Sequence, residues 1–324
     1  MDEKLSKQIY AFKAICLLSI VLAHTPYHGV DNQMAYNFLY SFSQFGVVGF
    51  FIVSGYFFSD TRKSFSQFWK GKLFTIFIPW FVAASMNYFK TILHGGFDIL
   101  NYFYYLIGNR NIFYFLSMLV LCYLLLWKFR KNNKVLLFVI ILTAASKYLT
   151  FIGILPDSSV DMNPFTNPYL NVFNYLGLFA IGCLMKNRTS KLQESKGITK
   201  TLIGIVLVAG GSYLNGVSIY LDFFAWLMYV AGWLYLAYKL AFNYLYDVEH
   251  IVAIGKVTMT IYMYHLFLST KFLTSDLMLN NWFAAVCRPF MIIAVIYAVI
   301  RALNIICSET KAYNAFKIIT GIRL

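Results

Sequence analysis

The chain alternates between long apolar runs and short polar segments, and ten of the runs have the length of a membrane-crossing helix. We expect these helices over residues 9–26, 36–59, 73–93, 112–129, 135–154, 170–185, 201–216, 221–240, 257–273 and 283–306. The polar segments between them are too short to fold as a soluble domain. Residues 1–324 are therefore predicted to form a single integral membrane domain.

Composition agrees with this pattern. Of the 324 residues, 60% are hydrophobic and only 12% are charged, which is about half the charged share of a soluble domain. The mean hydropathy is +0.64. Aromatic residues make up 19% of the chain, as expected where many helix ends lie at membrane interfaces. The predicted fold class is all-α, a polytopic helical bundle in a membrane.

The distribution of basic residues predicts how the helices are oriented. With the N-terminus in the cytoplasm, most of the 27 lysines and arginines fall on the inner side of the membrane. The outer side receives five, some of them within helix ends: Lys90, Arg110, Lys147, Lys271 and Arg288. This bias predicts ten spans with both termini in the cytoplasm. It also accounts for the net charge of +14, so we expect no nucleic-acid partner.

The cysteines and the N-terminus carry little further signal. The five cysteines are scattered through apolar segments without a CxxC pair or a Cys/His cluster, so we expect neither a disulfide framework nor a metal site. No small-residue cleavage site precedes the polar residues of the first apolar run, so the first helix is expected to be retained.

Two ionisable residues, Lys13 and His24, lie eleven positions apart in the first predicted helix. In a continuous helix they share one face, within about 20° and about 16 Å apart along the axis. Each costs roughly 2.5–3.5 kcal/mol at the bilayer centre, for lysine most clearly, so the pair is a functional candidate. His24, near the outer end, suits a general base that deprotonates a hydroxyl. Lys13 would hold an anion or a carboxylate from the inner side.

A structural interpretation stays open for both residues. His24 could anchor a helix end in the headgroup region. Lys13 could extend its amine to the inner interface while its methylene groups stay in the apolar layer. The shared face is what favours a joint function over these two separate explanations.

Small residues and a basic stretch follow in and after the second predicted helix. Gly46, Gly49, Ser54 and Gly55 let another backbone approach closely, which fits either ordinary helix packing or a groove for a long, thin ligand. Four cations then follow: Arg62, Lys63, Lys70 and Lys72. Membrane orientation explains their charge fully, and phosphate binding is the functional alternative.

Two later segments add candidates. His265 lies about two turns inside the ninth predicted helix, after Tyr262, and a histidine at that depth needs a partner. It either bonds to a neighbouring helix or helps to build the same polar core as His24. The outer segment Leu155–Leu170 has two acids, three prolines and no basic residue, and is a candidate lid or glycan-facing surface.

In their order and spacing, these motifs resemble acyltransferase family 3, the integral membrane enzymes that O-acylate surface glycans and related acceptors. The matching residues are Lys13 and His24, then Gly49, Phe50, Phe51, Ser54, Gly55 and Tyr56, then Lys70, Lys72 and Pro79, and finally Gly255, Lys256, Tyr262 and His265. Lys13 stands where the family more often has arginine. Ile76 replaces a frequent second arginine, and Tyr114 replaces a tryptophan in the fourth predicted helix. The resemblance spans the whole chain.

The resemblance implies a multi-pass enzyme of the bacterial cytoplasmic membrane. Its donor would be an acyl-CoA, most often acetyl-CoA in this family, and its acceptor a hydroxyl of a glycan or lipid-linked glycan. His24 would be the general base or would form a covalent acyl-histidine, and Lys13 would orient the pantetheine or phosphate region of the donor. The remaining residues would bind the donor or complete the polar core: Arg62, Lys63, Lys70, Lys72, Ser54 and Gly55 for the donor, and Tyr262 and His265 for the core. These motifs specify neither the acceptor nor the oligomeric state.

Three other classes of protein compete with this interpretation. A proton-coupled transporter or flippase would also use intramembrane lysine and histidine, but such proteins usually show internal repeats, and we find none. A glycan polymerase or ligase would usually carry several basic residues in a large outer loop, and residues 155–170 contain none. A purely structural membrane protein leaves the cost of Lys13, His24 and His265 unexplained.

Overall fold

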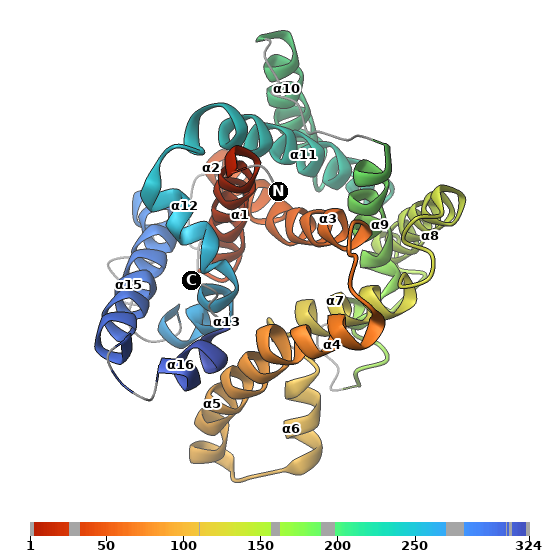
Figure 1. Ribbon diagram of the computed structural model, residues 1–324. Helices are drawn as coiled ribbons and strands as arrows, with labels where there is room; N and C mark the ends of the chain where they lie inside the picture. Colours follow the sequence, from red (N-terminus) through yellow and green to blue (C-terminus); the bar gives the residue numbers. More distant parts are fainter. Residues whose placement is uncertain are drawn as a thin grey trace. The chain divides into compact units, whose positions relative to one another are not determined.

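The computed structural model describes residues 3–25, 33–109, 111–156, 163–188, 198–269, 282–308, 310 and 313–321 (Figure 1). These residues form helices and connecting turns, with no strand among them. Within them, seven helical stretches are long and apolar enough to cross a membrane: Glu3–Ala23, Gln33–Ser59, Phe65–Leu93, Asn133–Phe151, Pro168–Arg188, Ile219–Leu245 and Val286–Ser308. The predicted all-α, multi-pass class is confirmed.

A helix lies in each of the ten predicted stretches. Their bounds are α1 (Glu3–Ala23), α2 (Gln33–Ser43) with α3 (Phe45–Ser59), α5 (Ile78–Gly95), α7 (Tyr114–Leu125), α8 (Asn133–Phe151), α9 (Phe173–Arg188), α10 (Ile198–Leu214), α11 (Ile219–Leu240), α13 (Thr258–Ser269) and α15 (Trp282–Ser308). Residues 270–273, the end of the predicted ninth helix, lie outside the described residues. Helices α7 and α10 are apolar but shorter than the seven candidate spans.

Among the described residues, four short α-helices lie outside the ten predicted stretches: α4 (Phe65–Lys72), α6 (Ile99–Leu106), α12 (Glu249–Lys256) and α16 (Tyr313–Thr320). Each has eight residues. Helices α6, α12 and α16 are far shorter than a membrane span, whereas α4 continues through Leu73–Phe77 into α5 and begins the Phe65–Leu93 stretch. Local signals nevertheless specify two of them. Ser64 and Gln67 form a reciprocal capping box at the start of α4, and the Asp98 side chain accepts hydrogen bonds from two backbone amides of α6.

The predicted single helix over residues 36–59 was wrong in one respect, because it is broken at Gln44 into α2 and α3. The break is stabilised from α1. The Ser19 hydroxyl donates a hydrogen bond of 2.7 Å to the carbonyl oxygen of Phe42 and accepts one of 2.9 Å from the backbone amide of Gly46. One buried side chain thus satisfies a donor and an acceptor that an unbroken helix would pair internally.

The chain divides into two compact units. Unit 1 comprises Met1–Gly49 and Gln193–Leu324, and unit 2 comprises Phe50–Leu192. In unit 1, α1 contacts α2, α11, α12, α13 and α15. The Gln8 amide in α1 donates a 2.9 Å hydrogen bond to the carbonyl oxygen of Phe242, which follows α11. Helix α1 is therefore the central element of unit 1.

Unit 2 is built on close contacts of α9 with α8 and with the second half of α3. A Cβ atom added at Gly55 in α3 would overlap the carbonyl oxygen of Phe179 in α9. A Cβ atom at Gly182 in α9 would likewise overlap the carbonyl oxygen of Ile52 in α3. In a membrane, where burial of apolar groups drives helix association weakly, such glycine contacts let the backbones pack closely.

The crossing of α3 and α9 gives a first prediction. Gly55→Ala should lower the apparent melting temperature of the detergent-solubilised protein by several degrees, because overpacking costs about 1–3 kcal/mol. Gly210→Ala in α10 is the matched control, since its Cβ would meet only the flexible end of Met228. Fluorescence-detected thermal unfolding measures both. Equal melting temperatures for the two variants would contradict the close crossing.

Candidate active site

His24 lies immediately after the last residue of α1, in a tightened turn. Its backbone amide bonds to the carbonyl oxygen of Val21 at 3.2 Å, and the Thr25 amide bonds to that of Leu22 at 3.0 Å. The predicted helix to residue 26 was therefore three residues too long, because Thr25 precedes Pro26 and a residue before proline avoids the helical conformation. The His24 side chain is exposed.

The structure brings His24 against His265 of α13, within unit 1. Their ring centroids are 5.3 Å apart, with the ring planes inclined at 39°. His265 is completely buried, and its Nδ1 atom lies 2.7 Å from the backbone carbonyl oxygen of Tyr262. The Tyr262 ring centroid lies 5.9 Å from that of His265. Residues more than two hundred positions apart in the sequence therefore form one polar group in unit 1.

Lys13 lies on the same helix but is not part of this group. Its side chain is half-buried, and its amine lies 5.4 Å from the centroid of the Tyr10 ring. The helical rise separates it from His24 by about 16 Å along the axis. Lys13 thus marks a second polar position nearer the N-terminal end of α1.

Three glycines hold α1 in place, and two of them, Gly49 and Gly255, belong to the recognised motifs. A Cβ atom at Gly46 would overlap the carbonyl oxygen of Cys16, and one at Gly255 in α12 would overlap that of Tyr10. At Gly49 the added atom would lie 2.5 Å from the Cys16 sulfur. Close helix packing is sufficient to explain why these positions are glycine. As a consequence, α3 and α12 fix the position of α1, the helix that carries Lys13 and that His24 follows.

The residues predicted to bind a donor lie in unit 2. Ser54 is half-buried, and Gly55 is covered by the α9 backbone, so close packing accounts for its small size. Arg62 and Lys63 precede the cap of α4, and their side chains are exposed. The remaining two cations, Lys70 and Lys72, lie in the last turn of α4, where positive charge is favourable.

Lys72 differs from the other three cations because its amine is already engaged. It donates a 3.1 Å hydrogen bond to the hydroxyl of Tyr123 in α7 and lies 4.4 Å from the centroid of that ring. Arg62, Lys63 and Lys70 are exposed, so their charges face the surroundings. The four predicted cations thus separate into three exposed ones and one held against an aromatic ring.

Two further cations of unit 2 were assigned only to membrane orientation by the sequence. Arg130 lies with its guanidinium carbon 4.5 Å from the Trp127 ring centroid and 5.6 Å from that of Phe58. Lys186 forms an ion pair of 3.5 Å with Asp60. Phe58 in turn contacts Tyr123, with ring centroids 5.1 Å apart. Arg130 and Lys72 therefore lie on one aromatic cluster, a proximity that no local spacing indicates.

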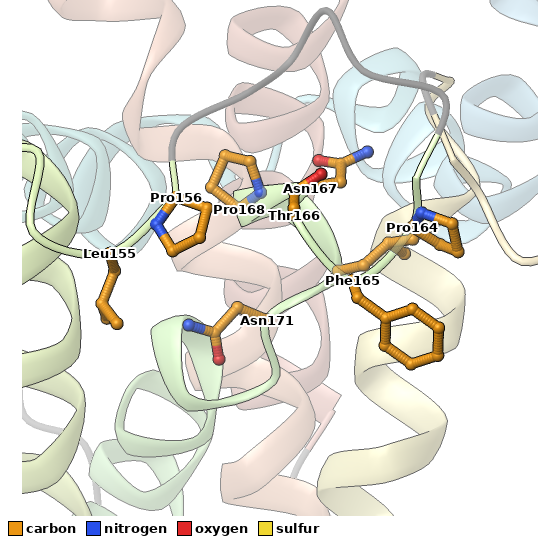
Figure 2. Close-up of a pocket in the computed structure, with 9 residues that line it drawn as sticks. Leu155, Pro156, Pro164, Phe165, Thr166, Asn167, Pro168 and Asn171 are labelled. Atoms are coloured by element: carbon orange, nitrogen blue, oxygen red, sulfur yellow. The ribbon is translucent and has the colours of Figure 1, made fainter.

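Residues of the segment predicted to lie on the outer side form a pocket of about 230 Å³ in unit 2 (Figure 2). Its lining residues are Leu155, Pro156, Pro164, Phe165, Thr166, Asn167, Pro168, Leu170 and Asn171. The two asparagine side chains hold the segment to its surroundings. Asn167 donates to the Asn109 side chain at 2.7 Å, and Asn171 donates to the Ser146 hydroxyl at 3.2 Å. Residues 157–162 of this segment lie outside the described residues.

A larger pocket of about 670 Å³ lies among α2, α10 and α11 in unit 1 and is lined mainly by apolar side chains. The residues that line these two pockets include none of the predicted site residues. We therefore base the chemistry on the histidine pair, because the pair combines an exposed ring with a buried ring that has a nitrogen unpaired among the residues that the structure describes.

Comparison with known proteins assigns the chain to a family. Residues 7–301 match the family model described as an acyltransferase domain, that of acyltransferase family 3. No curated protein and no solved structure matched significantly. Because the family match covers most of the chain, the protein belongs to acyltransferase family 3 and is an acyl-transferring enzyme of a membrane.

The support of α1 gives the second prediction. Ser19→Ala removes both hydrogen bonds at the break between α2 and α3, and each buried group left without a partner costs about 1–3 kcal/mol. We expect the apparent melting temperature in detergent to fall by several degrees. Ser66→Ala, at an exposed position of α4, is the control and should leave it unchanged. An unaltered melting temperature for Ser19→Ala would show that the break is stable without α1.

Proposed function

We propose that this enzyme moves an acyl group, in the simplest case acetyl, from cytoplasmic acyl-CoA to a hydroxyl of an extracytoplasmic or lipid-linked glycan. The observation that carries the proposal is the exposed imidazole of His24, supported by a second, buried imidazole. Family membership supplies the reaction class. The acetyl group, the glycan and the roles of individual residues are the proposed part.

The proposal includes a membrane topology. Ten spans with both termini in the cytoplasm fit the helices in all ten predicted stretches and the excess of lysine and arginine in the predicted inner segments. The family match runs through both compact units, which supports one catalytic domain over residues 1–324. This topology places the end of α1, and with it His24, at the outer side of a bacterial cytoplasmic membrane.

In the proposed mechanism, His24 acts as a general base. One imidazole nitrogen accepts the proton of the acceptor hydroxyl while the hydroxyl oxygen attacks the thioester carbonyl carbon. The carbon–sulfur bond then breaks, and the leaving thiolate takes the proton back from the imidazolium to give CoA. Direct attack of the imidazole on the thioester would instead give an acyl-histidine, which radiolabelled enzyme isolated without acceptor would reveal.

The donor is assigned to the exposed cations of unit 2. Arg62, Lys63 and Lys70 are available to the phosphates of CoA, and arginine in particular binds phosphate through two parallel hydrogen bonds. Lys72 is held by Tyr123 and would act through its charge. Lys13 would orient the pantetheine or phosphate region of the donor, and Ser54 stays among the residues proposed to bind the donor.

Ligand-dependent stability separates this proposal from a transporter or flippase. Acetyl-CoA should raise the melting temperature of the detergent-solubilised protein more than CoA or ATP, because a ligand that binds only the folded form adds RT ln(1 + [L]/Kd). A transporter for another solute is not expected to bind acetyl-CoA more tightly than CoA or ATP. Equal responses to all three compounds would count against acyl transfer from CoA.

The third prediction concerns the base. His24→Ala should reduce transfer of label from [¹⁴C]acetyl-CoA to glycan in membrane vesicles by roughly 10²–10⁴-fold, which is the usual cost of removing a general base. His250→Ala, at an exposed position of α12, is the matched control and should transfer normally. Normal transfer by His24→Ala would refute the proposed role.

The fourth prediction concerns the donor site. Replacing Arg62, Lys63 and Lys70 together by glutamine should raise the KM for acetyl-CoA by about tenfold, equivalent to about 1.4 kcal/mol, with little change in kcat. The control replaces three other exposed cations by glutamine: Lys128, Lys131 and Lys134. Both variants lose the same charge, so an equal rise in KM would indicate a general field effect instead of a phosphate site.

A further inference from the structure

In the buried ring of His265, one nitrogen takes part in a hydrogen bond with the described part of the chain and the other does not. Its Nδ1 atom lies 2.7 Å from the carbonyl oxygen of Tyr262. Its Nε2 atom is buried and has no hydrogen-bond partner among the described residues. A buried polar atom in that state costs about 1–3 kcal/mol, so its presence in a native protein calls for an explanation. We therefore asked which group this atom could serve.

The Tyr262 carbonyl oxygen fixes the tautomer of His265. A carbonyl oxygen only accepts hydrogen bonds, so the hydrogen must be on Nδ1. A charged ring would place a second hydrogen on Nε2 with nothing to receive it, and an isolated buried charge is very costly. The ring is thus neutral, and its Nε2 atom presents a lone pair that can accept one hydrogen bond.

His24 is in position to donate that bond. The two ring centroids are 5.3 Å apart. Two imidazoles joined by an N–H···N hydrogen bond of about 2.9 Å have centroids roughly 5 Å apart, so the two rings lie at the separation of such a pair. Because Nε2 of His265 has no partner in the part of the chain that the structure describes, the bond requires the His24 ring to turn toward it. His265 is completely buried, whereas His24 is exposed, so only His24 can meet a substrate.

We propose that His265 is a positioning residue that accepts the N–H of His24 and thereby holds the second nitrogen of His24, with its lone pair, toward the acceptor hydroxyl. The inference rests on the proposed function of His24. A base that is oriented by a third group is a recurring arrangement in nucleophilic and acid–base catalysis. Here the third group is a neutral imidazole, itself oriented by the backbone oxygen of Tyr262.

This assignment gives His265 two tasks in the reaction. Before the proton moves, the bond from His24 to Nε2 excludes the tautomer whose lone pair points into the protein. After the proton moves, the same bond stabilises the imidazolium of His24, because hydrogen bonds from a charged donor are stronger. His265 neither gains nor loses a proton, so the step balances between the acceptor hydroxyl, His24 and the leaving thiolate.

The kinetic test compares two replacements of His265. His265→Phe keeps an aromatic ring but removes the acceptor, and His265→Gln keeps an acceptor oxygen near the position of Nε2. We expect His265→Phe to lower kcat for acetyl transfer by roughly 10–100-fold, as removal of an orienting group does, with an unchanged KM for acetyl-CoA. His265→Gln should recover most of that loss. A purely structural role would not be rescued by glutamine in this way.

A double variant shows whether His265 acts through His24. In the His24→Ala background, adding His265→Phe should cause no further loss of transfer, because the orienting group has no base to orient. If His265→Phe lowered kcat by the same factor in both backgrounds, the two residues would act independently and the inference would be overturned.

A spectroscopic test needs no acceptor, and its decisive measurement is made on the wild-type protein. In the wild-type protein labelled with ¹⁵N-histidine, the His24 ring should exist as a single tautomer and His265 should carry its hydrogen on Nδ1. His265→Gln should preserve the single tautomer of His24, and His265→Phe should release it to a mixture. A mixture in the wild-type protein would overturn the inference, even if His265→Phe failed to fold.

The outcomes keep the two proposals separate. If His24→Ala transfers normally, the proposed function fails. If His24→Ala is inactive while a folded His265→Phe keeps its kcat, the function stands and the role of His265 falls. If both variants are impaired, glutamine rescues and the double variant shows no added loss, both are supported.

Discussion

The fold of unit 1 depends on how closely other backbones approach α1. Apolar side chains gain little by leaving lipid for protein, so contacts between backbones and buried hydrogen bonds must hold the helices together. Gly46 and Gly255 bring two helices onto the carbonyl oxygens of α1, and the Ser19 hydroxyl binds the break between α2 and α3. His24 directly follows the end of this fixed helix, which gives it the defined position that its proposed role as a base requires.

Much of this could be predicted from the sequence. Apolar length predicts a helix in each of the ten stretches, because backbone groups in lipid must be satisfied within the segment. The cost of an isolated polar side chain in the membrane predicts that His265 has a partner, but the sequence leaves open whether that partner is a neighbouring helix or His24. The structure places the His265 ring against His24. The sequence also contains local signals for helix ends that apolar length alone does not reveal. Ser64 forms a capping box at the start of α4, and Pro26 follows the end of α1.

Other features depend on partners that are distant in the sequence and could not be predicted. The break at Gln44 is stabilised by Ser19 of another helix, and Gln44 itself carries no break signal. Lys72 looks equivalent to Lys70 in the sequence, yet only Lys72 meets Tyr123, which is fifty-one positions away. Basic charge alone therefore indicates orientation in the membrane, and the aromatic surroundings distinguish one cation from another.

The bond between His265 and the carbonyl oxygen of Tyr262 lies entirely within α13. The imidazole therefore takes its orientation from the same helix that carries it, and no neighbouring helix sets which nitrogen bears the hydrogen. A displacement of α13 would carry ring, tautomer and lone pair along as one rigid body. Only the distance between the His265 and His24 rings would change. The tautomer of His265 would stay the same, and a movement of α13 would alter only whether its Nε2 atom can accept a hydrogen bond from His24.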